Sequence, residues 1–181
     1  MPISSVVKTK RDGILTLAAL SGGAFDLTTG ALKAGAKSLD VAYEGGDFNL
    51  SIPGPAVNNF LDRGQFSDPP SVRYGNDQPL TWSFTAYLRD LSDAAYATLE
   101  EILMQSGYVG ANWESTIGDA AGCAEVFAIG VRWKMLGTIH CDATDHIIIL
   151  QYNTVTGSLA EGDPNTISLS GTDFECYPTV I

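Results

Sequence analysis

The side chains best suited to chemistry gather in one short segment, His140 to His146. Two histidines, one cysteine and two aspartates lie within these seven residues, and all three residue types can bind Zn²⁺. The segment has none of the usual spacings of zinc ligands, however, and Asp and Thr are ordinary turn formers. We therefore expect a turn between two strands and no metal, with a metal site at His140, Cys141 and His146 as the alternative.

A second segment, Gly30 to Ser38, comes close to the spacing of a phosphate-binding loop. In that motif a lysine directly follows the second glycine, so that it reaches the phosphates held by the loop amides. Here Ala36 separates Gly35 from Lys37. A strand pattern follows, whereas a phosphate site would need a helix whose dipole attracts the anion. We expect no nucleotide and no other cofactor.

No motif for nucleophilic catalysis occurs in the sequence. A Gly-x-Ser-x-Gly turn is absent, and the only two histidines lie together in the segment described above. Two acidic residues could act as a glycosidase pair, but among 21 acids such pairs arise by chance. We expect a protein that is not an enzyme, and we keep a small carboxylate-dependent hydrolase as one alternative.

The composition is that of a single folded domain. The chain has 181 residues, 45% of them hydrophobic, with three Trp, seven Tyr and seven Phe. A chain of this length buries roughly 70% of its unfolded surface, which is enough for a hydrophobic core. Disordered acidic segments are poor in aromatic residues, so that class is excluded. We treat residues 1–181 as one domain.

The charge is strongly acidic and unevenly distributed. The net charge is -11, from 21 acidic and 10 basic residues. Residues 1–74 hold seven of each sign, so the fourteen acids and three bases that follow carry the whole excess. Phosphate binding needs a cluster of basic residues, which ten scattered cations do not provide. A conventional nucleic-acid-binding protein is therefore excluded.

The sequence predicts neither a membrane span nor a secretory signal. The longest apolar runs, such as Ile147 to Leu150, have four residues, far from the roughly 18 to 20 of a membrane span. We recognise no apolar core of a signal peptide behind the basic residues near the N-terminus, so we expect no secretory signal. Three widely spaced cysteines argue for synthesis in a reducing compartment.

Alternating hydrophobicity predicts mostly β-strands. Strands are expected over 14–20, 80–88, 124–136, 146–156 and 166–172, the last after a turn at 161–165. A hairpin is expected where 39–43 and 47–52 flank Glu44-Gly45-Gly46, because glycines supply the positive φ angles of a tight turn. Residues 21–38 lack a clear period and are expected to form a surface excursion or a weak hairpin.

One helix and one long loop complete the pattern. A helical spacing of apolar residues predicts a helix from about Asp93 to Gln105. Residues 53–79 hold five of the eight prolines, and a loop of this length exceeds the ~12 to 15 residues usual in compact domains. We expect an extended arm that reaches a neighbouring subunit, or else a mobile surface loop. Because one helix cannot cover several strands, the core is expected to lie between packed sheets.

Several short segments together resemble the major tail tube proteins of bacteriophages with long, non-contractile tails. They are residues 8–17 (KTKRDGILTL), 41–48 (VAYEGGDF), 63–64 (RG), 77–80 (DQPL) and 161–169 (EGDPNTISL). The order of the expected elements agrees with that family: hairpin, long loop, apolar strand, single helix and closing strands. The stretches 21–38 and 118–123 are longer than a minimal member of the family needs.

The resemblance implies a mainly β fold of two packed antiparallel sheets, a sandwich or partial barrel, with one flanking α-helix. It also implies a structural virion protein of the phage tail, assembled in the host cytoplasm as stacked rings of six copies. Double-stranded DNA would pass through the tube without specific binding, and neither a cofactor nor membrane insertion would be involved. The expected partners are other copies of the chain and other tail proteins, namely the tape measure, tail terminator and distal tail proteins.

The resemblance further suggests roles for individual residues. A conduit lined with carboxylates repels DNA phosphates, and the candidate lumen-facing acids are Asp40, Glu44, Asp47 and Glu125. Solvated outer carboxylates that aid solubility are the alternative role for these four. The N-terminal arm 1–12 and the loop 53–79 would contact the adjacent subunit or ring. The candidate contact residues there are Lys8, Lys10, Arg11, Arg63 and Arg73.

A carbohydrate- or receptor-binding β-sandwich is the alternative function. Exposed aromatic rings would form its ligand platform, and the candidates are Trp82, Trp113, Trp133 and Tyr108. Trp82 and Trp133 lie at the apolar positions of alternating segments, so we expect both in the core.

Overall fold

In a computed structural model of the protein, the described part of the chain consists of ten β-strands and their connections. The structure describes residues 13–19, 24–34, 38–41, 48–54, 56–60, 71–76, 78–88, 98–99, 129–137, 144–173, 175 and 177–181. The strands are β1 (Gly13–Ala19), β2 (Ser38–Val41), β3 (Asn49–Ser51), β4 (Val57–Phe60), β5 (Ser71–Tyr74), β6 (Leu80–Tyr87), β7 (Ile129–Met135), β8 (His146–Ala160), β9 (Thr166–Asp173) and β10 (Thr179–Val180). No helix is among the elements of these ranges.

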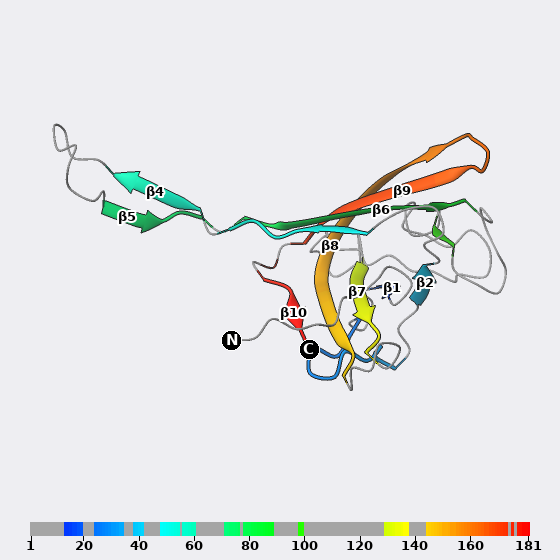
Figure 1. Ribbon diagram of the computed structural model, residues 1–181, viewed down its shortest axis with the longest axis horizontal. Helices are drawn as coiled ribbons and strands as arrows, with labels where there is room; N and C mark the ends of the chain where they lie inside the picture. The colour runs from blue at the N-terminus through cyan, green and yellow to red at the C-terminus, as the bar shows by residue number, and fades with distance from the viewer. Residues whose placement is uncertain are drawn as a thin grey trace, which may run out of the picture.

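Eight of the strands form one antiparallel sheet (Figure 1). Its order is β2-β1-β7-β8-β9-β6-β3, and β10 pairs with the beginning of β8. The strands β4 and β5 pair with each other in a separate two-stranded ladder. The prediction of a mainly β, antiparallel fold is confirmed.

Strand β6 shows how the sequence builds the core. Its buried face holds Leu80, Trp82, Phe84 and Ala86. The residues between them carry hydroxyl groups and are exposed or half-buried, because successive side chains of a strand point to opposite faces. Leucine, isoleucine and valine side chains from β1, β7, β8 and β9 complete the same buried cluster. The strand expected over 80–88 is confirmed.

Strand β8 forms the corner of the sheet. Its first half pairs with β7 and β10, and from Asn153 onward it pairs with β9. The β7–β8 ladder changes register between Ile129 and Val131, and such bulges bend a strand. Figure 1 shows β8 as a long, bent ribbon that runs from one part of the sheet to the other. The strand expected over 146–156 is therefore present and continues to Ala160.

Aromatic contacts show that the sheet curls around its core. The rings of Phe48, beside β3, and Trp133, on β7, have centroids 5.3 Å apart. In the sheet order β3 and β7 are four strand spacings apart, which would be roughly 19 Å in a flat sheet. Phe48 also stacks with Trp82 on β6, at 6.5 Å. The strands β3 and β7 therefore approach each other across a shared apolar interior.

The hairpin expected over residues 39–52 is wrong in its pairing. Both strands exist, but β2 pairs with β1 and β3 pairs with β6, at opposite ends of the sheet order. The connecting residues 42–47 lie outside the described residues. Alternation predicts strands, whereas packing selects their partners: Val41 of β2 is buried in one cluster with Leu15 and Leu17 of β1.

Residues 24–34 anchor themselves to the sheet through a few buried residues, although most of the segment is exposed. Phe25 and Leu32 form an antiparallel bridge, so the expected weak hairpin is present. Most of its residues are exposed, but the side chain of Phe25 is fully buried and ties the segment to the sheet. Gly130 on β7 permits this packing, since a Cβ atom at that position would lie 2.6 Å from the Cβ of Ala24. The hairpin thereby closes a second buried cluster that also contains Ala18, Ile147 and Ile149.

The other expected elements are confirmed where the structure describes them. β1 and β9 match the strands expected over 14–20 and 166–172 to within one residue at either end. β7 covers the second part of the strand expected over 124–136, whose residues 124–128 lie outside the described residues. The helix expected from about Asp93 to Gln105 also lies outside them, apart from residues 98–99.

Candidate assembly surfaces

The β4–β5 hairpin forms an arm that stands away from the sheet (Figure 1). It begins where the backbone N–H of Gly75 donates to the carbonyl oxygen of Ala56 at 2.7 Å. Pro53 and Pro79 lie between this arm and the β3–β6 ladder, and proline cannot donate to a ladder. The arm is therefore the outer part of one long hairpin, with a joint at the prolines. The segment 53–79, expected to be a loop, contains two strands.

The arm has no strand partner beyond its own two strands within the described residues. Ser51 pairs with Thr81 and Val57 pairs with Tyr74, so the five residues 52–56 on one side of the joint face the six residues 75–80 on the other. This shift in register prevents a continuous ladder from running into the arm. An isolated two-stranded hairpin is marginally stable in water. A surface that covers the arm would therefore stabilise it.

A second candidate surface is the outer face of the strands β3, β6, β9 and β8. Three transverse rows of side chains cross this face in register: Ser51-Thr81-Thr172-Thr154, Asn49-Ser83-Ser170-Thr156 and Thr85-Ser168-Ser158. All eleven are Ser, Thr or Asn, and each is exposed or half-buried. We call these eleven residues the hydroxyl lattice. The opposite face of the same strands carries the apolar core.

Hydrogen bonds tie neighbouring strands together within the hydroxyl lattice. The hydroxyls of Thr85 and Ser168 are 3.0 Å apart, and those of Thr156 and Ser170 are 3.1 Å apart. Two shallow hollows lie on the lattice, and the eleven residues supply most of their lining. The surface can therefore exchange hydrogen bonds with water or a partner, but it offers no charge.

Sequence alone showed only part of this surface. The alternation of Thr81, Ser83 and Thr85 with large apolar residues is visible in the sequence, as is the alternation of Ser168 and Ser170. The rows exist because the β6–β9 and β8–β9 registers place hydroxyl opposite hydroxyl. A shift of one residue in either register would bring apolar side chains to the same face.

The corner of the sheet is fixed by a buried amide. The Nε1–H of Trp82 donates to Oδ1 of Asn153 at 2.6 Å, and both side chains are almost wholly buried. The Nδ2 group of Asn153 donates to the carbonyl oxygens of Ile129 and Leu150, at 3.1 and 2.9 Å. This one side chain therefore satisfies polar groups from three strands at the position where β8 changes partners.

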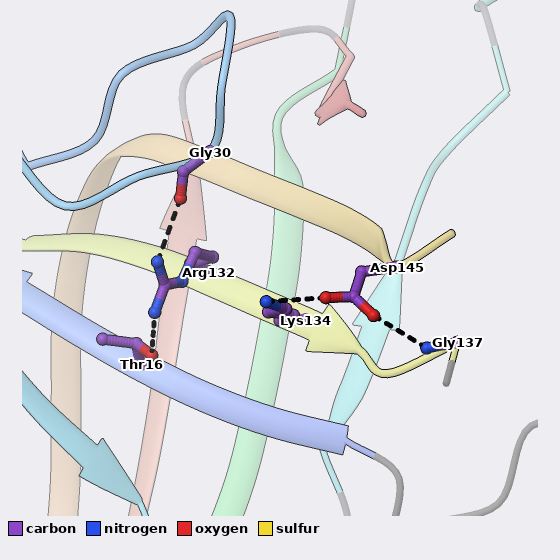
Figure 2. Close-up of polar contacts among 6 residues, drawn as sticks. All are labelled: Thr16, Gly30, Arg132, Lys134, Gly137 and Asp145. Carbon is purple, nitrogen blue, oxygen red and sulfur yellow. Dashed lines mark hydrogen bonds and ion pairs between the residues drawn. The ribbon is translucent and has the colours of Figure 1, made fainter. Parts of the chain in front are cut away.

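Asp40 is the candidate lumen acid that the structure describes, and it belongs to a hydrogen-bond chain. The hydroxyl of Thr16 donates to Oδ1 of Asp40 at 2.5 Å, and Arg132 donates to that hydroxyl at 2.9 Å. Arg132 also donates to the carbonyl oxygen of Gly30 at 3.0 Å, as Figure 2 shows, and lies over the ring of Phe25. Asp40 thus helps to hold β2, β1 and β7 together, although its side chain is exposed.

The end of β7 is held by a second polar contact. The Nζ of Lys134 lies 2.7 Å from Oδ2 of Asp145, whose other oxygen accepts from the N–H of Gly137 at 2.9 Å (Figure 2). Asp145 comes from the segment that prompted the metal alternative, and its neighbour His146 is exposed at the start of β8. Within the described ranges, no three His, Cys, Asp or Glu residues gather as metal ligands would. His140 and Cys141 lie outside those ranges.

The other candidate residues lie largely outside the described part of the chain. This holds for the acids Glu44, Asp47 and Glu125 and for the bases Lys8, Lys10, Arg11 and Arg63. Arg73 lies on β5 of the arm, opposite Asn58. The structure therefore brings none of the described candidates together into one site.

Among the described residues, two carboxyl groups have pKa values shifted in opposite directions. The carboxylate of Asp26 accepts the N–H groups of Thr29 and Thr28, both at 2.8 Å, which lowers its pKa below the ordinary 3.8. Burial raises the pKa of Glu175 above 4.5, against the smaller opposing effect of a hydrogen bond from the backbone of Gln151. Asp26 lies in a turn, and Glu175 lies in the connection between β9 and β10.

Comparison with known proteins gives no family. No protein-family model matches the chain, and no curated protein matches its sequence. In the part of the chain that the structure describes, no helix is both long and apolar enough to span a membrane.

Proposed function

We propose that this chain is the structural subunit of a phage tail tube. Six copies form a ring, and stacked rings form a conduit through which double-stranded DNA leaves the virion. The proposal starts from the resemblance of the segments 8–17, 41–48, 77–80 and 161–169 to major tail tube proteins of long-tailed phages. Its partners are further copies and the tape measure, terminator and distal tail proteins, and its place is the virion tail.

The observation that carries the proposal is the arm. β4 and β5 stand away from the sheet and pair only with each other among the described strands (Figure 1). A hairpin of this kind gains stability when a second surface covers it, and a neighbouring copy is the surface that a repeating assembly supplies. Because the arm and the surface that receives it differ, the contact is heterologous and can continue from ring to ring.

The fold supports the finer part of the proposal as well. Two packed layers would consist of β2, β1, β7 and the first half of β8 on one side, and of β3, β6, β9 and the second half of β8 on the other. The contact of Phe48 with Trp133 across the interior favours this arrangement. The helix expected from about Asp93 to Gln105 would flank these layers. Edge strands of such sheets are ready to pair with other chains, as ring formation requires.

A conduit must not bind the DNA that passes through it. Phosphate binding depends on clustered Lys and Arg side chains, and the chain has ten such residues against 21 acids. The net charge of -11 therefore favours passage without retention. Asp40 offers an exposed carboxylate for this purpose, although its contact with Thr16 gives it a structural role too.

The alternative function, carbohydrate or receptor binding, loses one of its candidate platforms. Trp82 is 2% exposed, as expected for a core residue, whereas Trp133 is half-buried and its ring lies tilted against that of Phe48 at the edge of the core. Trp113 and Tyr108 lie outside the described residues. A flat aromatic surface is therefore not available from the first two rings, and we do not pursue this function.

Removal of the arm tests the proposal. Residues 57–74 would be replaced by Asn-Gly, a two-residue turn that suits the already paired Ala56 and Gly75. The full chain and this variant are compared by sedimentation velocity over rising concentration, with circular dichroism as the control for folding. We expect the full chain to form hexamers and longer particles and the folded variant to lose them. A full chain that stays a monomer or a closed dimer, or two chains that assemble alike, would contradict the proposal.

A further inference from the structure

The hydroxyl lattice is unusual for the surface of a soluble protein. Charged residues make up 17% of this chain, so about two would be expected among eleven positions taken at random. The hydroxyl lattice has none, although the chain carries 31 charged residues in all, 21 acidic and 10 basic. Solubility alone does not explain why this face excludes charges of both signs.

A buried contact between copies is an equally poor explanation. The cores of protein interfaces are enriched in aromatic residues, Met and Arg and are depleted in Ser. The hydroxyl lattice contains none of the enriched residue types, and five of its eleven members are serines. Its side chains are also short, and several are exposed, including Thr81, Thr156 and Ser170. The composition thus fits a face that stays wet and lets another body move past.

We infer that the hydroxyl lattice lines the channel of the assembled tube and is the surface along which DNA slides, an inference that rests on the proposed function. Lysine or arginine would hold each phosphate electrostatically, whereas a face without charged side chains neither holds nor repels it strongly. Hydroxyl groups exchange hydrogen bonds with water and with phosphate at little net gain. The DNA therefore slides along a hydrated surface that has no charged side chains. The acidic residues act on the DNA from other parts of the subunit.

Cysteine labelling locates the surface in the assembled particle. Ser170→Cys is a near-isosteric change at an exposed site, and it is made in a chain whose three native cysteines are replaced by alanine. A small maleimide and a maleimide on a polymer too wide for the channel are applied to dissociated subunits and to assembled tubes. We expect both reagents to label the subunits, and only the small one to label the tubes.

The outcomes separate this inference from the proposed function. Tubes labelled by the wide reagent would place the hydroxyl lattice outside, and tubes labelled by neither reagent would place it in a contact between copies. Subunits labelled by neither would show that the chain itself covers it. Each of these three results overturns the inference but leaves the proposed tube function untouched. A chain that forms no rings overturns both the inference and the proposed function.

As a second measurement, Ser170→Lys tubes should retain short duplex DNA at low salt, whereas Ser170→Gln tubes should not. Equal retention by the two variants would count against the inference.

Discussion

The indole N–H of Trp82 donates a 2.6 Å hydrogen bond to the side-chain oxygen of Asn153 inside the core. The two residues lie on β6 and β8, which are not neighbours in the sheet, because β9 separates them. The bond therefore crosses the interior at the corner where β8 exchanges β7 for β9. It joins the strands that carry the hydroxyl lattice to the rest of the sheet.

Asn153→Ala should destabilise the protein by about 2–4 kcal/mol, because it removes the acceptor of the buried Trp82 N–H and two hydrogen bonds to backbone carbonyls in the core. Urea denaturation measures the change. Trp82→Phe removes the same donor from the other side, so the double variant should lose less than the sum of the two single variants. Strictly additive losses would mean that the hydrogen bond contributes nothing.

Gly171→Ala should destabilise the protein by about 1–3 kcal/mol through overpacking. A Cβ atom there would lie 2.6 Å from the carbonyl oxygen of Thr154 and would also meet the Trp82 ring. The matched control is Gly54→Ala, where no atom lies within 4 Å of the added carbon. We expect the control to change stability by less than about 0.5 kcal/mol in the same denaturation experiment. Equal effects at both positions would contradict the packing described for Trp82.

The fold could be predicted from the sequence where a local pattern is sufficient. The alternation from Leu80 to Tyr87 gives a strand with one apolar face, and the turn before Thr166 gives a strand boundary. Pairing could not be predicted, because Val41 is buried with β1 residues that lie more than 20 positions away. Phe25 was missed for the same reason, since only the gap above Gly130 makes its burial possible.

The candidate surfaces could likewise be predicted from the sequence only in part. The prolines and the length of the segment 53–79 indicated an arm, but not its two strands, which have only four residues each. The hydroxyl lattice depends on three registers that no single strand reveals. The role of Asp40 in a chain with Thr16 and Arg132 likewise depends on residues far apart in the sequence.

Asp26→Asn should lower stability near neutral pH, and the difference from the unmodified protein should shrink in acid. The folded pKa of Asp26 lies below 3.8, so its stabilising effect is fully present above that value and is lost as the pH falls through the folded pKa. Asparagine keeps an oxygen that can accept the N–H groups of Thr28 and Thr29, so the change isolates the charge. Denaturation midpoints across this range provide the measurement. A difference that persists unchanged in acid would contradict the assignment.

Glu175→Gln should have the opposite effect. Burial raises the folded pKa of Glu175 above 4.5, so the folded state favours the protonated acid. The contribution of this group to stability falls as the pH rises from 4.5 through the folded pKa. The glutamine variant should therefore be the more stable protein near neutral pH and should match the unmodified protein below 4.5. A glutamine variant that is less stable near neutral pH would show that the ionised carboxylate is needed there.

Electron microscopy of the purified full chain tests the central claim most directly. The account predicts rings with sixfold symmetry that stack into tubes with an open channel, and it predicts that these particles disappear when the arm at residues 57–74 is replaced by Asn-Gly. Uniform monomers or closed twofold dimers at every concentration, with the arm intact, would contradict it.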